Sequence, residues 1–213
     1  MAINTYATLK TAVQNWSKRS DTLSVIDDFI DLAEAEMWSG PTMVADSQPL
    51  RVRAMEARAT ATTSTTDRFL ALPTGYLEMR KLRLKSGNNN YDLNFRVPEA
   101  LNVKDSSSIP TDYAITEELE FNCIPASAYT AEMHYYKKLT ALSSSNTSND
   151  ILTNYPNVYL FGCLYHFGLW AMNDNFVQKY GPLFRDAIKA ANKSDKKGRF
   201  GPGKAMRIEG PTP

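Results

Sequence analysis

The sequence predicts an α+β protein: an antiparallel bundle of four main helices with an inserted small antiparallel β sandwich or barrel, and a flexible C-terminal tail. Apolar residues recur every three or four positions near both ends of the chain and alternate with polar residues in the middle, and the last stretch is rich in Gly, Pro and Lys. The expected parts are residues 1–40 and 151–192 for the bundle, 41–142 for a loop and the β insertion, and 193–213 for the tail.

Length and composition are those of a globular protein with one core or two small lobes. The 213 residues are 43% hydrophobic and 22% charged, which excludes a disordered, collagen-like or disulfide-dense chain. The net charge of +1 gives no overall attraction to nucleic acid or to an anionic membrane. Two cysteines without CxxC spacing, and a start without a signal-peptide pattern, predict a reduced protein made inside a cell.

Two helices are predicted at the start of the chain. Over residues 6–16 the apolar residues have helical spacing, with Asn4 or Thr5 as N-cap. The same spacing continues from Leu23 over residues 23–37, and a Gly-Pro pair at 40–41 ends the second helix. We expect the two helices to be antiparallel because only a short polar turn joins them.

The middle of the chain, residues 51–139, is expected to form short strands. Turn signals occur at 65–67, 73–75 and 86–90, and one helical turn is expected at 98–103. Apolar residues alternate with polar ones in three places, as in half-buried strands: Tyr91, Leu93 and Phe95; Leu119, Phe121 and Cys123; and Tyr129, Ala131, Met133 and Tyr135.

The last two predicted helices follow a Ser-, Asn- and Thr-rich spacer at 143–149. Pro156 begins a helix that is apolar nearly all round to residue 172 and is too short to span a bilayer, so it is expected to be buried. Residues 173–175 are predicted to break it, and Pro182 to begin the last helix. The tail after it holds six Lys and Arg residues against two acidic ones, and either becomes ordered on a partner's surface or is a disordered solubilising end.

No residue pattern indicates an enzyme, and no catalytic residue, metal site or cofactor is expected. His134 and His166 lack metal-ligand spacing and are interpreted as packed or hydrogen-bonded residues. Cys163 and His166 share a helix face, but apolar surroundings would raise the pKa of the thiol and leave it unreactive. P-loop, GxGxxG and GxSxG motifs are absent from the sequence.

Charged residues offer three candidate contact surfaces. A stripe of carboxylates on the second helix is either a contact with a basic neighbour, a cation site or a solvated face. Two groups of basic residues either contact phosphates of a nucleic acid or form a solvated or ion-paired face. The stripe comprises Asp27, Asp31 and Glu34; the basic groups are Arg51, Arg53 and Arg58, and Arg80, Lys81, Arg83 and Lys85.

Several segments together resemble the head-to-tail adaptor, or tail tubular, proteins of tailed bacteriophages, especially short-tailed phages. The resemblance runs in order from residue 1 to about 191. It is carried by MAINTYATLKTAVQNW, TLSVIDDFIDLAEAEM, RVRAMEARA, LALPTGYLEMRKLRL, PTDYAI with LEFNCIP, MHYYKKLTALS and ILTNYPNVYLFGCL. One segment departs from the family: WSGPTMVADSQP, residues 38–49, is longer than the usual link and is interpreted as a phage-specific contact loop.

The resemblance implies a structural protein of the virion neck, made in the host bacterial cytoplasm, without a membrane anchor. It implies a dodecameric ring that docks on the portal and receives tail nozzle or tail tube proteins, while genomic DNA passes through without sequence-specific binding. The acidic stripe with Arg51, Arg53 and Arg58 would then lie at subunit interfaces, and Arg80, Lys81, Arg83 and Lys85 would face the channel. The portal-docking segment would comprise Lys193, Lys196, Lys197, Arg199, Phe200, Lys204 and Arg207.

Two other functions remain open from the sequence. A DNA-binding accessory protein of phage assembly would use the basic residues between 51 and 85. A virion-associated hydrolase would need a pair of carboxylates in a cleft, for which Glu118 with Glu120, or Glu56 with Glu78, are available.

Overall fold

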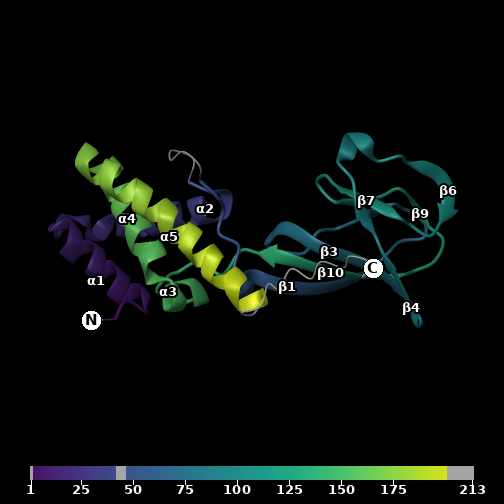
Figure 1. Ribbon diagram of the computed structural model, residues 1–213, viewed down its shortest axis with the longest axis horizontal. Coiled ribbons are helices and arrows are strands. Elements are labelled where there is room, and N and C mark those ends of the chain that lie inside the picture. The colour runs from purple at the N-terminus through teal and green to yellow at the C-terminus, as the bar shows by residue number, and fades with distance from the viewer. Residues whose placement is uncertain (1, 42–46, 201–213) are drawn as a thin grey trace, which may run out of the picture. The chain divides into compact units, whose positions relative to one another are not determined.

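The computed structural model describes residues 2–41 and 47–200, and the chain divides into two compact units (Figure 1). A helical unit combines Met1–Ala54 with Thr140–Pro213, and a β unit is formed by Met55–Leu139. The protein is therefore α+β, as the sequence predicts. The helices of the first unit are α1 Tyr6–Ser17, a 3-10 turn Asp21–Ser24, α2 Ile26–Ser39, α3 Asp150–Asn154, α4 Pro156–Trp170 and α5 Asp174–Phe200.

The ends of α1 and α2 follow from local hydrogen bonds. Thr5 caps α1: its side chain accepts from the Thr8 N–H, and the Thr8 hydroxyl oxygen accepts from the Thr5 N–H at 3.0 Å. Leu23 was expected on the buried face of the second helix, but it lies in the 3-10 turn and is 56% exposed. At the other end of α2, Gly40 adopts a φ of 89° and donates its N–H to the Glu36 carbonyl.

Helix α4 is the centre of the helical unit and packs against α1, α2, α3 and α5 (Figure 1). Residues 158–168 are buried, apart from the half-buried Phe161. Gly162 permits close packing, because a Cβ there would lie 2.9 Å from Ala33 Cβ in α2 and 3.0 Å from Phe184 Cε2 in α5. The chain's own helices thus cover most of its apolar surface. In the described part of the chain, no helix is both long and apolar enough to cross a membrane.

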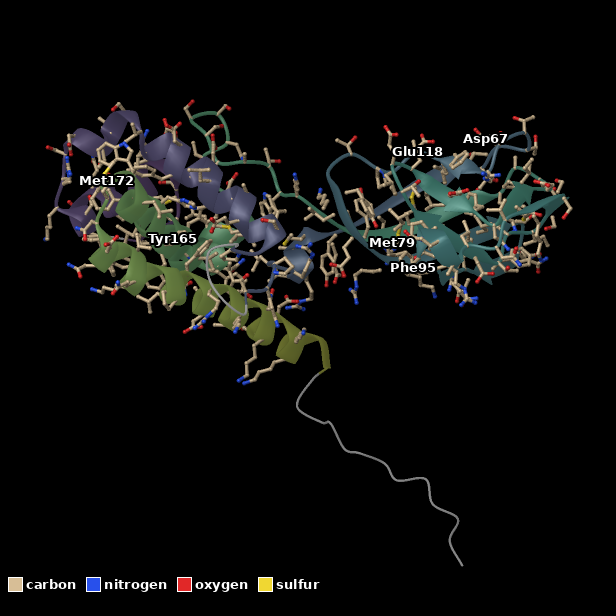
Figure 2. All side chains as sticks on the ribbon, turned by 90° about the horizontal axis from the view of Figure 1, so that it is seen from above. Asp67, Met79, Phe95, Glu118, Tyr165 and Met172 are labelled. Atoms are coloured by element: carbon tan, nitrogen blue, oxygen red, sulfur yellow. The ribbon has the colours of Figure 1, made fainter. Side chains whose placement is uncertain are left out.

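Helix α5 begins earlier than predicted. The predicted break between the last two helices is present but lies at residues 171–173, and Asn173, which accepts the Phe176 N–H, helps to begin α5 at Asp174. Pro182, predicted as a first residue, lies inside the helix with its ring exposed. Between α4 and α5 the chain turns at Met172, which is 92% exposed and has a φ of 50° (Figure 2).

The C-terminal part of α5 also corrects a prediction. Residues 193–200 are helical up to Phe200 and are not a flexible tail. The helix continues there because Asp195 is buried and ion-paired to Arg53, a contact between residues 142 positions apart. The remaining predicted tail, 201–213, and residues 42–46 of the predicted contact loop lie outside the described residues.

The β unit contains two four-stranded sheets and a two-stranded one. Their strand orders are β1-β10-β3-β4, β2-β8-β7-β5 and β6-β9. The first sheet is antiparallel throughout, but β5 pairs parallel with β7 and β6 parallel with β9, so the prediction of an antiparallel insertion is wrong for these two pairs. The strands are β1 Glu56–Thr62, β2 Phe69–Leu70, β3 Tyr76–Ser86, β4 Asn89–Asp92, β5 Asn94–Phe95, β6 Lys104–Ser108, β7 Asp112–Ile115, β8 Leu119–Phe121, β9 Cys123–Pro125 and β10 Thr130–Lys137.

The parallel pairs arise because the chain makes a crossover between β5 and β7 rather than a hairpin. This crossover includes a 3-10 turn, Pro98–Ala100, where one helical turn was predicted, and the strand β6, which the sequence pattern did not indicate. Residues 104–108, KDSSS, are polar throughout, so no alternation of apolar residues marked this strand.

The core of the β unit confirms most of the predicted alternation. The buried cluster contains Leu82, Leu84, Leu93, Tyr113, Leu119, Phe121, Tyr129, Ala131, Met133 and Tyr135. Phe95, labelled in Figure 2, was predicted to share this pattern, but it is 55% exposed. Its ring contacts Tyr113 edge-on. β5 is an outer strand of its sheet and pairs with β7.

Candidate assembly surfaces

The acidic surface of α2 is smaller than the sequence pattern indicates. Asp27 is hydrogen-bonded by the Tyr6 hydroxyl and forms an ion pair with Lys10 at 2.8 Å. Partial burial opposes ionisation of Asp27, but the hydrogen bonds from Lys10 and Tyr6 hold its pKa below the ordinary value. Asp31 is exposed. Asp27 therefore links α2 to α1, and Asp31 remains accessible to a partner.

Glu34 is a core residue and not a surface carboxylate. It is 5% exposed, and its Oε1 accepts the Tyr159 hydroxyl at 2.7 Å and the Leu142 N–H at 3.0 Å. Burial raises the pKa of Glu34, and these two hydrogen bonds partly offset the effect. The prediction that Glu34 contacts another subunit is wrong, since its carboxylate joins α2 to α4 and to Leu142, near the point where the chain returns from the β unit to the helical unit.

Arg51 and Arg53, predicted at a subunit interface, bind their own chain. Arg51 donates its N–H to Asn192 Oδ1 at 2.8 Å, while Asn192 Nδ2 donates to the Pro49 carbonyl at 3.0 Å. The Arg53 guanidinium pairs with Asp195 at 3.0 Å. These contacts fasten the segment before the β unit to α5. The Arg51 guanidinium donates to the carbonyls of Trp38 and Leu50, and the Arg53 side chain remains 57% exposed.

The end of α5 presents a cluster of cations. Lys193, Lys196 and Lys197 are exposed, while Asp195 between them is 6% exposed and turned toward Arg53. Cations near a helix C-terminus are stabilised by the helix dipole. The other residues of the predicted docking segment lie outside what the structure describes: the side chains of Arg199 and Phe200, and the whole of Lys204 and Arg207.

Three of the four cations in the basic group on β3 are ion-paired. Arg80 pairs with Glu56, while Lys81 and Arg83 both pair with Asp92, at 3.1 and 2.7 Å. The hydrogen bonds from Arg83 and Lys81 lower the pKa of Asp92. Three of the four cations are therefore ion-paired, although the two carboxylates of the same sheet, Glu56 and the shared Asp92, offset only part of their charge.

Two cations of this sheet face, Arg58 and Lys85, have no ion-pair partner in the described ranges 2–41 and 47–200. The register places Arg58 opposite His134 on β10 and His134 opposite Lys81 on β3. A register shift beside His134 makes Arg80 an extra residue of β3, so Arg80 and Lys81 are both exposed. A hollow of about 450 Å³ lies here, lined by Glu56, Ala57, Arg58, Arg80, Lys81, His134 and Tyr135.

A buried polar cluster on α2 and α4 was missed by sequence reasoning. Buried atoms of Glu36, Tyr165 and His166 lack hydrogen-bond partners among the described residues, and His166 Nε2 is 3.8 Å from Glu36 Oε1, beyond hydrogen-bonding distance. Burial raises the pKa of Glu36 and lowers the pKa of His166 to about 4. Figure 2 places Tyr165 among the helices. The sequence pattern shows an apolar helix here and gives no sign of Glu36 beside it.

The candidate hydrolase carboxylates are ion-paired, exposed or on separate strands. Glu120 is ion-paired to Arg68 at 2.9 Å, and Glu56 to Arg80. Glu78 and Glu56 lie on different strands with β10 between them. Glu118 is exposed on the β unit (Figure 2). Burial raises the pKa of Cys163, as its apolar helix predicts, and the described residues contain no group of three or more side chains that could hold a metal.

The sequence pattern of one protein family matches almost the whole chain. The match is to the SU10 adaptor protein family and covers residues 4–206. The chain belongs to this family of phage head-to-tail adaptors. The adaptor match spans both the helical unit and the β unit. Comparison of the adaptor with curated proteins gives no match. As a phage adaptor, the protein is a structural component of the virion.

Proposed function

We propose that this adaptor forms a dodecameric ring in the neck of the virion, docks on the portal, extends the DNA channel and provides the attachment site for tail proteins. The observation that carries the proposal is the family match over residues 4–206. The protein acts by binding and not by catalysis; the separation and ion pairing of its candidate carboxylates support this.

The charge distribution on β3 favours a channel component over a DNA-binding accessory protein. A protein that binds duplex tightly needs several free cations, because each phosphate contact releases counterions and adds affinity. Arg80, Lys81 and Arg83 are each ion-paired, to Glu56 or to the shared Asp92, so little of their charge is free for phosphates. A surface of this kind would let DNA pass without holding it.

The exposed lysines at the end of α5 support docking on an acidic portal surface. Lys193, Lys196 and Lys197 are on a rigid helix, so their ordering costs less conformational entropy than the ordering of a flexible tail. Truncation before Lys193 is a poor test of this role, because it would also remove Asp195 and its ion pair with Arg53.

Charge reversal on α5 provides a cleaner test. The full-length protein and its Lys196→Glu/Lys197→Glu variant are mixed with rings of the cognate portal, and the added mass is measured by mass photometry. We expect the wild type to add a fixed number of subunits, and the variant to bind at least about tenfold more weakly, or about 1.4 kcal/mol. Raising the salt concentration should weaken the wild-type complex as well.

Lys137→Glu/Lys138→Glu is the matched control, because it reverses two adjacent exposed lysines of the β unit and changes the net charge equally. Equal loss of docking in both variants would mean that overall charge, and not the end of α5, controls binding. Absence of any added mass on the portal, together with binding of duplex DNA, would contradict the adaptor ring and favour the accessory protein.

A further inference from the structure

The four-stranded sheet has two open edges. Among the described strands, β1 pairs only with β10, and β4 only with β3. The seven residues of β1 contain no proline, lysine or bulge, and the only charged side chains of this strand are Glu56 and Arg58. An edge of this length is a template for the addition of another strand, provided that the partner strand matches these charges.

The register identifies the backbone groups that β1 presents at its open edge. The Thr63 N–H donates to the Tyr129 carbonyl, so the backbone groups of Thr63 point toward β10. The backbone groups of an antiparallel strand point alternately to one neighbouring strand and to the other, so those of Ala57, Ala59 and Ala61 also point toward β10. The N–H and C=O groups of Arg58, Thr60 and Thr62 therefore point outward.

Strand β4 also presents backbone groups at its open edge. The Leu93 N–H donates to the Leu82 carbonyl at 3.2 Å, so Leu93 faces β3. Alternation then directs the backbone groups of Asn90 and Asp92 away from β3, toward the open edge. Both side chains are exposed.

The two edges are complementary in direction and in pleat. Three antiparallel steps separate β1 from β4, so the two strands run in opposite directions and would be antiparallel if β4 of one copy lay beside β1 of another. The outward-directed residues of both strands have exposed side chains, on the same face of the sheet. The pleats therefore match when the two edges meet.

Charge selects one register. Arg58 has no ion-pair partner among the described residues, and the Asp92 side chain is 59% exposed. Placing Asp92 opposite Arg58 puts opposite charges side by side, which is favourable for a cross-strand pair. Antiparallel geometry then places Asn90 opposite Thr60, and both positions exchange backbone hydrogen bonds.

We propose that β4 of one adaptor copy adds to β1 of the next in this register, so that neighbouring four-stranded sheets join. The contact uses two different edges, so it is heterologous and suits a closed ring. This inference rests on the proposed ring and names the strands that hold it together. Figure 1 shows the end of the β3–β4 hairpin as a projecting tip of the β unit, which is accessible to a second copy.

A disulfide between copies tests the pairing in the full-length chain. The variant Thr60→Cys/Asn90→Cys keeps Arg58 and Asp92 and is assembled on portal rings under mild oxidation. Directly opposed residues lie about 5.5 Å apart between Cα atoms, within disulfide range. Inside one chain the two sites are separated by three strand spacings, roughly 14 Å, so only copies can be joined. We expect a ladder of covalent multimers beyond the dimer on a non-reducing gel.

Thr62→Cys/Asn90→Cys is the matched control, because it shifts one site by two residues, roughly 7 Å along the strand. The native Cys123 and Cys163 are buried, so they give little background. A ladder from the control as strong as from the test pair would overturn the register. No ladder from either variant, on portals that carry full rings, would overturn the strand pairing while the adaptor function stands. If the wild type adds no ring to the portal, the proposed function itself fails.

Discussion

At the scale of single residues, His166 is held in an unusual state for an imidazole. It is 6% exposed, its Nε2 has no hydrogen-bond partner among the described residues, and burial lowers its pKa from 6.5 to about 4. The native imidazole is thus neutral over a range in which the unfolded one is protonated. Between about pH 6.5 and pH 4 the unfolded state binds more protons, so the free energy of unfolding falls as the pH falls.

We expect His166 to lower the free energy of unfolding by up to about 3 kcal/mol between pH 7 and pH 4. Glu36 works in the opposite direction, because burial raises its pKa and the native carboxyl keeps a proton that the unfolded one has lost. The measurement is denaturant unfolding of wild type and His166→Phe at several pH values. The variant should show a smaller loss toward acidic pH.

Comparison of the pH slopes, and not of the absolute stabilities, removes the cost of repacking the larger ring. Identical slopes for wild type and variant would show that His166 does not contribute to the pH dependence. A second variant, His134→Phe, changes the other histidine, which lies on a half-exposed strand position, and controls for a general effect of histidine removal.

At the scale of elements, the end of α5 depends on contacts that are distant in sequence. Asn192 bonds both the Arg51 N–H and the Pro49 carbonyl. We expect Asn192→Ala to cost about 1–3 kcal/mol, because it leaves two part-buried backbone groups without partners. Hydrogen exchange of the Arg51 amide should become faster, as should trypsin cleavage after Arg51.

The matched control is Ser194→Ala, two residues further along α5, where the side chain is exposed. This substitution should leave the exchange of the Arg51 amide unchanged. If Asn192→Ala also leaves it unchanged, the segment before the β unit is held by its apolar residues, and the asparagine contacts add nothing measurable.

The same element shows where sequence reasoning succeeds and where it fails. Local periodicity predicts α1 and most of α2, because each buries one continuous stripe. It misplaces the start of α5, since Asn173 and Pro182 usually interrupt helices, whereas here the first caps α5 and the second is exposed within it. It misses residues 193–200 because their anchor, Arg53, is far away in the sequence.

The candidate surfaces follow the same rule. Charge patterns found the exposed lysines of α5 and the exposed Asp31. They did not show that Glu34 is buried, although it lies four residues after Ile30 and three before Met37 on the apolar stripe of α2. Its partners Tyr159 and Leu142, which make a buried carboxylate possible there, are distant in the sequence. Sequence alone finds charges, while ion pairs depend on which strands become neighbours.

At the scale of the whole molecule, the two compact units can be followed separately. All three tryptophans, Trp16, Trp38 and Trp170, belong to the helical unit, so tryptophan fluorescence reports on that unit alone. Leu82 is 1% exposed in the core of the β unit. We expect Leu82→Ala to destabilise the β unit by about 2–5 kcal/mol, seen by far-UV circular dichroism, with little change in the fluorescence transition.

Leu164→Ala is the counterpart, because Leu164 is fully buried in α4. It should shift the fluorescence transition strongly. Equal shifts of both signals in both variants would show that the chain unfolds as one cooperative system despite its division into two units.

The helical unit is built from both ends of the chain, and this determines the order in which its parts become available during synthesis. α1 and α2 leave the ribosome first, with their apolar faces uncovered, while α4, which covers them, is translated on the order of 10 s later. The contiguous β unit is complete before then. In an infected cell that makes many copies at once, the newly synthesised N-terminal helices are the part of the adaptor that most needs a chaperone, because their apolar faces are still uncovered.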